Sequence, residues 1–290
     1  MRLFECLSSV SRIRILELLN KREMNISELA KELNISTPII TRHINILEES
    51  GLIRTKKISG KRGIQKICVL AVNELNLVFE RSTLEKSCGR ISIPIGQYIA
   101  YDVSPTCGLA STEGFIGLCD DPRYFSNPDH IRASLLWFRT GWVEYLIPSY
   151  LIGTNKISSI NISLELCSEY PIYRENYPSD IHFYLNGCLL GVWTSPGDFG
   201  SVKGIYTPDW WQLGTQYGLL KNININRTGC FIDGIPLSNL TLEQIPFIYG
   251  KDLTFRIAVP ADARNPGGLN LFGRGFGNYD QDIEVTIVYL

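Results

Sequence analysis

The sequence predicts a multidomain α+β chain, with a winged helix-turn-helix at the N-terminus and an antiparallel, jelly-roll-like β-sandwich after it. Its 290 residues exceed the size of most single domains. Apolar residues recur at helical spacing up to about residue 50, and at the alternating spacing of strands afterwards. We therefore expect a winged helix-turn-helix domain at residues 1–72, a helix or linker at 73–90, and a β-sandwich domain at 91–290.

The composition is that of a globular protein, with 44% hydrophobic and 20% charged residues. No apolar run approaches the roughly 18 residues of a membrane span. Charged residues interrupt the first 20 positions, which excludes the apolar core of a signal peptide. We therefore expect a cytoplasmic protein without membrane contact.

The eight cysteines are scattered without a C-x-x-C pair, which predicts reduced, mostly buried thiols. A redox switch would need an exposed thiol of low pKa.

Charge is distributed unevenly along the chain. Residues 1–72 hold about 13 Lys and Arg against about 7 acidic residues, an excess of about six positive charges. Since the whole chain has a net charge of -1, the remainder carries about seven negative charges. This asymmetry predicts that the N-terminal part meets a polyanion.

Two short helices are predicted before residue 35. Residues 11–20 place apolar side chains on one side, namely Ile13, Leu16 and Leu19. Residues 28–33 follow a helix start that is either a capping box between Asn25 and Glu28 or a Ser27 cap.

A third helix follows Ser36, which is its expected cap. Pro38 is tolerated there because first-turn amides have no intrahelical partner. Its buried stripe consists of Ile40, Ile44 and Leu47. Gly51 ends the helix. The outer face is then polar, with Thr37, Thr41, Arg42 and Asn45.

After Gly51 the apolar period changes to that of strands. Residues 52–58 and 64–70 predict a β-hairpin, which carries basic side chains at Arg54, Lys56, Lys57, Lys61, Arg62 and Lys66. Two short helices followed by a basic hairpin are typical of a winged helix-turn-helix. The second helix reads base edges in the major groove, and basic hairpin residues hold phosphates.

The predicted DNA contacts follow from this arrangement. They are Ser36, Thr37, Pro38, Thr41, Arg42, His43 and Asn45 on the helix, and Arg54, Lys57, Lys61 and Arg62 on the hairpin. Arg42 is the first choice for a base contact or a nearby phosphate. The alternative is a merely solvated surface, which the ordered combination of helix pair, polar face and basic hairpin disfavours.

The segment ISELAKELNISTPIITRHINILEESGLIRTKKISGKRGIQ resembles the winged-helix repressors of the ArsR type, over roughly residues 4–85. The resemblance implies a repressor and a homodimer on a pseudo-palindromic DNA operator. It implies pairing through residues 1–7 with 11–20 and through a helix at 73–86. The metal-sensing branch has paired cysteines where this chain has residues 27–34, which hold no cysteine or histidine. We therefore expect no metal site there.

Beyond about residue 91 the pattern is that of strands separated by turns. The clearest runs are residues 157–166, 181–185, 189–193, 219–226, 253–259 and 282–289. Asn186-Gly187 is the strongest hairpin signal. Many short strands with Gly, Pro and Asn turns predict an antiparallel sandwich of jelly-roll type.

The sequence of this region contains no motif that predicts catalysis, a metal site or a cofactor site. Its two histidines, His130 and His182, lie far apart in the chain, and there is no G-x-S-x-G. Acidic pairs such as Asp120-Asp121 are turn residues in our interpretation, with a calcium site as the alternative.

Two stretches, residues 193–198 with 206–212 and residues 271–282, combine aromatic rings with Asp, Asn, Gln and Arg. Rings stack on sugar C–H groups and planar polar side chains bind hydroxyls, in a concave apolar site. We expect adjacent Trp210 and Trp211 to point to opposite faces of a strand, with one outside the core. The predicted ligand residues are Trp193, Asp198, Tyr206, Asp209, Trp210, Trp211, Arg274, Asn278 and Asp280. Alternatively, these aromatics fill the core and the glycines form turns.

The combined prediction is a DNA-binding transcription regulator whose β domain senses a small molecule, a carbohydrate first of all. The alternative is a β domain that serves as a protein-interaction or oligomerisation module without a small ligand. An enzyme fused to the DNA-binding domain is disfavoured because no catalytic constellation is found. A pocket lined by Trp193, Trp210 or Trp211 would favour the sensor, and a flat apolar patch would favour the module.

Overall fold

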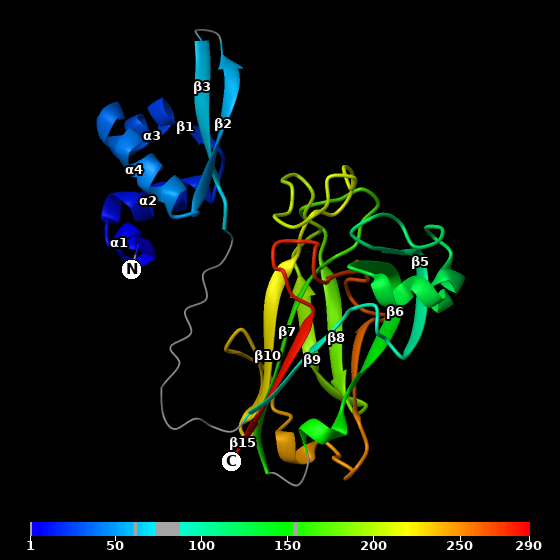
Figure 1. Ribbon diagram of the computed structural model, residues 1–290. Coiled ribbons are helices and arrows are strands. Elements are labelled where there is room, and N and C mark those ends of the chain that lie inside the picture. The colour runs from blue at the N-terminus through cyan, green and yellow to red at the C-terminus, as the bar shows by residue number, and fades with distance from the viewer. Residues whose placement is uncertain (1, 61–62, 73–87, 153–155) are drawn as a thin grey trace. The chain divides into compact units, whose positions relative to one another are not determined.

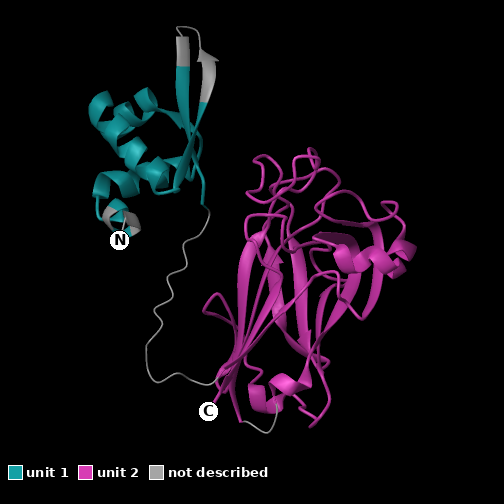
Figure 2. Ribbon diagram, in the orientation of Figure 1, with its two compact units in different colours: residues 1–80 teal, residues 81–290 magenta. Residues whose placement is uncertain are grey.

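The computed structural model describes residues 2–60, 63–72, 88–152 and 156–290. The chain divides into two compact units, Met1–Glu80 and Arg81–Leu290 (Figure 2). The dimerisation helix expected at residues 73–86 lies outside the described residues. Strand β4 (Cys88–Ile93) begins inside the stretch assigned to the linker, so residues 88–90 are part of the β unit.

The described residues of the N-terminal unit form a winged helix-turn-helix (Figure 1). Its elements are α1 (Arg2–Leu7), α2 (Val10–Leu19), β1 (Met24–Asn25), α3 (Ile26–Leu33), α4 (Thr37–Glu49), β2 (Ile53–Gly60) and β3 (Gly63–Leu70). The sheet order is β1-β3-β2, and β1 was not predicted. Pairing of β2 with β3 continues to Gly60 opposite Gly63, which extends the strands into the segment expected to be a turn.

Helix α3 begins with the capping box, the first of the two predicted starts. The Asn25 side chain accepts from the Glu28 N–H at 2.9 Å, and the Asn25 N–H donates to Glu28 Oε2 at 2.8 Å. Helix α4 follows Ser36, whose side chain makes no capping hydrogen bond, and ends before Gly51 at φ +72°. Its predicted stripe of Ile40, Ile44 and Leu47 is fully buried.

The stripe predicted for α2 is wrong at one position. Ile13 is 40% exposed, whereas Ile15 is fully buried and Leu19 nearly so. Residues four apart lie on one helix face, while Ile13 and Ile15 are separated by about 200° around the axis. Because apolar residues occur on both sides of α2, the pattern alone did not identify the inner face.

The β unit is an antiparallel sandwich of jelly-roll type, as predicted. Its described strands are β4, β5 (Ala100–Ala110), β6 (Leu135–Ile147), β7 (Ile157–Cys167), β8 (Ser179–Leu185), β9 (Cys188–Ser195), β10 (Leu219–Asn226), β11 (Gly229–Ile232), β12 (Ile235–Ser238), β13 (Leu253–Val259), β14 (Leu269–Phe272) and β15 (Ile283–Tyr289). All six predicted runs are strands. Asn186 and Gly187 both have positive φ in the hairpin between β8 and β9, as a two-residue primed turn requires.

One hydrogen-bonded path runs through most of these strands in the order β12-β11-β10-β7-β14-β6-β13-β8-β9. Strands β15 and β14 share one edge of β7, and β5 pairs with the outer edge of β6. The two ends of the path meet, since Ser238 Oγ on β12 donates to the Leu190 carbonyl on β9 at 2.5 Å. The sheet therefore curls into a barrel-like sandwich.

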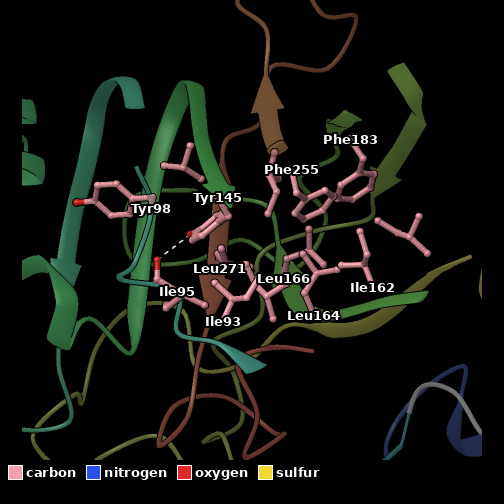
Figure 3. Close-up of a cluster of buried hydrophobic side chains, with 14 of the residues drawn as sticks. Ile93, Ile95, Tyr98, Tyr145, Ile162, Leu164, Leu166, Phe183, Phe255 and Leu271 are labelled. Atoms are coloured by element: carbon pink, nitrogen blue, oxygen red, sulfur yellow. Dashed lines mark hydrogen bonds between the residues drawn. The ribbon is translucent and has the colours of Figure 1, made fainter. Parts of the chain in front are cut away.

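The interior between the layers is apolar (Figure 3). The rings of Phe183 and Phe255 stack with centroids 6.4 Å apart. Tyr145 is fully buried, and its hydroxyl donates to the Ile95 carbonyl at 2.7 Å, which satisfies its polar group. A second, smaller cluster beside this core contains Trp137, Phe199, Phe272 and Phe276.

Candidate nucleic-acid interface and ligand site

Helix α4 presents a polar outer face opposite its buried stripe. Five of the predicted DNA contacts are exposed there, namely Ser36, Thr37, Pro38, Arg42 and Asn45. Arg42 forms no ion pair with any described residue, so its guanidinium is available for a phosphate or a guanine edge. This face therefore has the chemistry of a recognition helix.

Two predicted contacts on α4 are less accessible. The Thr41 hydroxyl donates to the Thr37 carbonyl at 2.9 Å, a bond within the helix. His43 is half-buried, and its Nδ1 is buried without a hydrogen-bond partner among the described residues. Burial, and then the charges of Arg12 and Arg42, lower the pKa of His43. We expect a neutral imidazole that faces away from the exposed surface.

Sequence reasoning missed one residue of this face. Ile39 is 50% exposed in the first turns of α4, between Pro38 and the buried Ile40. An apolar side chain at such a position can contact a thymine methyl group. The signal was available in the sequence, since Ile39 falls outside the buried stripe of Ile40, Ile44 and Leu47.

The hairpin supplies one exposed cation without a partner among the described residues, Arg54. Lys56 pairs with Glu23 at 3.2 Å, and Lys66 pairs with Glu48 at 2.9 Å. Lys66 therefore links the hairpin to α4, and Lys56 links it to the segment between α2 and β1. Lys57 lies on β2 but its side chain is not described, and Lys61 and Arg62 lie outside the described residues.

The structure places the predicted ligand residues of the β unit in several different settings. The Trp193 ring on β9 lies 5.2 Å from Lys221 Nζ and packs against the main core. Tyr206 is exposed, and Asp209 is exposed and pairs with Lys203 within the same loop. Trp193 therefore belongs to the sheet, whereas Tyr206 lies beside the loop of Asn278, because its N–H donates to the Gly277 carbonyl at 2.9 Å.

The glycine-rich stretch 273–282 is a loop closed around a buried carboxyl. Glu165 on β7 accepts N–H bonds from Gly218, Asn278 and Tyr279 at 2.8, 2.8 and 2.9 Å. Burial raises the pKa of Glu165 to about 7, although these hydrogen bonds oppose the shift. A side chain at Gly277 would collide with this carboxyl.

The remaining polar residues of that loop are also engaged within it. The Asn278 side chain accepts from the Ile205 N–H at 3.0 Å, and the Asp280 side chain accepts from the Gly275 N–H at 3.2 Å. Arg274 pairs with Asp282 at 3.3 Å. The loop thus matches the alternative in which these residues form turns.

The prediction that Trp210 and Trp211 lie in a strand is wrong. They lie within a turn of residues 208–211, which is closed by the bond from the Trp211 N–H to the Pro208 carbonyl at 3.1 Å. Both rings pack on the smaller cluster, with their centroids 5.4 Å apart. Proline at 208 favours such a turn and removes a donor from any ladder. The pair is therefore not divided between two faces of a sheet.

Trp211 lines a concave site of ≈ 270 Å³, which we call the Glu169 hollow. Its aromatic wall consists of Phe115, Trp137 and Trp211. Its other side is formed by residues 170–172 and 213–214, and its polar groups come from Thr106, Asp120, Glu169, Thr215 and Asn270. Of the predicted ligand residues, Trp211 lies in the lining, and Asp198 lies directly behind it.

The floor of the hollow is a buried polar network. Glu169 accepts from Asn270 Nδ2 at 2.7 Å and from the Thr106 hydroxyl at 3.1 Å. Asp198 is fully buried and accepts from the Tyr170 N–H at 2.8 Å. Burial raises the pKa of Glu169 to about 7, and burial together with the charge of Glu169 raises that of Asp198 to about 8.

Sequence reasoning missed most of this site. Phe115 and Trp137 lie on or beside β5 and β6, which were not predicted as strands, and Glu169 follows the end of β7. The residues are separated by up to about 160 positions in the chain, from Thr106 to Asn270, so no local pattern could bring them together.

The comparisons with known proteins agree with the geometry of the N-terminal unit. The model of the arsR family of bacterial regulatory proteins matches residues 9–55. An uncharacterised HTH-type transcriptional regulator of Methanocaldococcus jannaschii is 45% identical over 51 residues, 18% of this chain and 54% of that protein. The match thus spans about half the length of this curated relative. The chain carries an ArsR-type helix-turn-helix at its N-terminus.

Solved structures are similar to each unit separately. Reduced HlyU from Vibrio cholerae is 24% identical, over 25% of this chain and 72% of that chain, with a TM-score of 0.23. The CBM36-1 domain of a multidomain xylanase, from the hindgut metagenome of Trinervitermes trinervoides, is 9% identical over 69% of this chain and 96% of that chain, with a TM-score of 0.30. Within the described residues, no helix has the length and apolar character needed to cross a membrane.

Proposed function

We propose that the protein is a transcription regulator that binds double-stranded DNA as a homodimer and whose β unit senses a carbohydrate. Residues 1–72 would bind the operator, 73–90 would contribute to pairing, and 91–290 would bind the effector. Effector binding would change operator affinity by favouring one of two arrangements of the recognition helices. Repression is the mode that we infer from the ArsR type.

The observation that carries the proposal is the outer face of α4. Arg42 and Asn45 are exposed on a helix whose opposite face is buried, in a segment that the arsR family model matches. Arg54 on the hairpin adds an exposed cation at the wing. This arrangement suits base contacts by the helix and phosphate contacts by the wing.

Support for a homodimer comes from the apolar surface of the first two helices. Phe4 on α1, and Val10 and Ile13 on α2, are exposed. Exposed apolar side chains grouped on neighbouring helices suit an interaction site, and a second copy of the chain would cover them. Val10→Asp should therefore shift the protein towards the monomer in sedimentation experiments.

Support for a small-molecule effector comes from the Glu169 hollow. Aromatic walls over a few polar groups are the general features of a ligand pocket, and aromatic faces with amide and carboxyl groups suit sugars. A hollow lined by Trp211 favours the sensor over the alternative of a protein-interaction module without a small ligand.

The test begins with selection of bound sequences from random double-stranded DNA, followed by affinity measurements on the selected site. Arg42→Ala should weaken binding by about 10- to 100-fold and relax sequence choice at the position it reads. Arg90→Ala, an exposed arginine on β4 of the other unit, is the matched control. Unchanged affinity and specificity in Arg42→Ala would refute the recognition-helix assignment.

A further inference from the structure

The Glu169 hollow contains buried acidic groups without a cationic partner. Glu169 and Asp198 are both buried, and neither forms an ion pair with a described lysine or arginine. Asp120 is the second carboxyl group of the lining, beside Glu169, and none of the described residues that line the hollow is basic. Buried carboxylates are costly unless they are paired, so the floor retains a proton or accepts a cation. An anionic ligand would place further negative charge beside these groups, whereas a cationic ligand would supply the missing positive charge.

The aromatic wall favours the same kind of ligand. Phe115 is 54% exposed, and its ring centroid lies 5.3 Å from that of Trp211 and 6.3 Å from that of Trp137. The Trp211 indole is held in place by its donation to the Thr215 carbonyl at 2.9 Å. Exposed faces of such rings attract both cations and the C–H groups of a sugar ring.

The opposite rim holds a residue in an unfavourable conformation. Ile172 has φ +77°, and its side chain is exposed at the mouth of the hollow. A β-branched residue rarely occupies the left-handed region, and such conformations cluster at ligand sites. This rim is therefore built at an energetic cost that a role in binding would explain.

The floor also has an acceptor for hydroxyl groups. Asn270 Nδ2 donates to the Ser168 carbonyl, Glu169 Oε2 and Thr215 Oγ1 at 2.7, 2.7 and 3.1 Å. The Asn270 carbonyl oxygen accepts no hydrogen bond from the described residues, and Asn270 lines the hollow. That oxygen can accept from a ligand hydroxyl beside the acidic group.

We propose that the Glu169 hollow binds an amino sugar, a pyranose that carries a protonated amine. The ammonium pairs with Glu169, the ring C–H face lies on Trp211 and Phe115, and a hydroxyl donates to Asn270. At ≈ 270 Å³ the hollow lies near the lower end of ligand-pocket volumes, which limits it to about one ring. This inference rests on the proposed carbohydrate effector and narrows its chemistry.

The test is calorimetric titration of the full chain with matched sugars. The panel consists of glucosamine, galactosamine and mannosamine, their N-acetyl derivatives, the parent hexoses, and glucuronate. At least one hexosamine should bind about tenfold or more tightly than its parent hexose and its N-acetyl derivative, and glucuronate should not bind. Glu169→Gln should remove the preference for the amine, and Glu243→Gln, an exposed carboxylate elsewhere on the unit, should keep it.

Each other outcome has a defined meaning. If hexoses bind as tightly as hexosamines, the amino-sugar inference is overturned while the carbohydrate effector stands. If Glu169→Gln keeps its fold, by near-ultraviolet circular dichroism, and also keeps the preference, the placement of the site is overturned. If no sugar of the panel binds, the inference and the carbohydrate effector both fail, while DNA binding is decided separately by Arg42→Ala.

Discussion

The outer surface of α4 exposes its polar groups to water, whereas the Glu169 hollow buries them. The outer face of α4 belongs to one helix of 13 residues, and its arginine and asparagine remain in water. The hollow is assembled from segments between Thr106 and Asn270, and its carboxyls are removed from water. The first site can change one residue without disturbing its neighbours. In the second, every group depends on the packing of the others.

The largest expected effect is a loss of stability in the β unit that leaves the stability of the helical unit unchanged. Phe183→Ala removes a fully buried ring from the β unit, which should lower its free energy of unfolding by about 3–5 kcal/mol. Scanning calorimetry should show the transition of the β unit moving down while that of the helical unit stays in place. An equal shift of all transitions would mean that the two units unfold together.

The next largest effect is a difference between the two units in how their stability depends on pH. The pKa values of Glu165 and Glu169 are raised to about 7 and that of Asp198 to about 8, so the folded β unit binds more protons than the unfolded chain. Their contribution to stability is complete below the unfolded pKa and is lost as pH rises through about 7 to 8. The melting temperature of the β unit should fall by at least about 2–4 °C between about pH 6 and pH 8.5.

The helical unit serves as the internal control for this pH effect. The pKa of Glu48 is lowered by bonds from Thr55 and Lys66, and the pKa of His43 is lowered by burial. Stability linked to both groups is gained as pH rises, which is opposite in sign to the loss expected for the β unit. A parallel fall in both units would contradict the assignment to the buried carboxyls.

A smaller effect tests which residue caps the N-terminus of α3. Asn25→Ala removes the capping box and should lower the free energy of unfolding of the helical unit by about 0.5–2 kcal/mol. Ser27→Ala, at an exposed position in the first turn, should have much less effect. Chemical denaturation measures both variants. A larger loss for Ser27→Ala would reverse the assignment of the cap.

The smallest effect concerns the wing. Arg54→Ala should reduce the slope of log affinity against log salt by about one, and should weaken all DNA sequences nearly equally. Lys56→Ala should change the slope less because Lys56 already pairs with Glu23. Fluorescence anisotropy from low to moderate salt measures both slopes, and identical slopes would remove Arg54 from the phosphate contacts.

Short-range sequence patterns predicted most elements of the helical unit. They predicted the wrong buried face where both faces of a helix carry apolar residues. The Asn25 capping box, the Ile40 stripe and the basic hairpin depend on neighbours within a few residues. Helix α2 has apolar residues on both sides, so Ile13 was assigned to the wrong one. The Trp210-Trp211 pair failed for a related reason, since strand alternation was applied to a turn.

The sequence by itself determined the class of each unit and the outer face of the recognition helix. Helical and strand periods, caps and turns are encoded by residues close together in the chain, and so is the polar face opposite Ile40, Ile44 and Leu47. Only the tertiary structure decided that Glu169, Trp211 and Asn270 share a hollow and that Glu165 anchors a loop. Those contacts follow from the pairing of distant strands, and burial then sets the pKa values of carboxyls that look ordinary in the sequence.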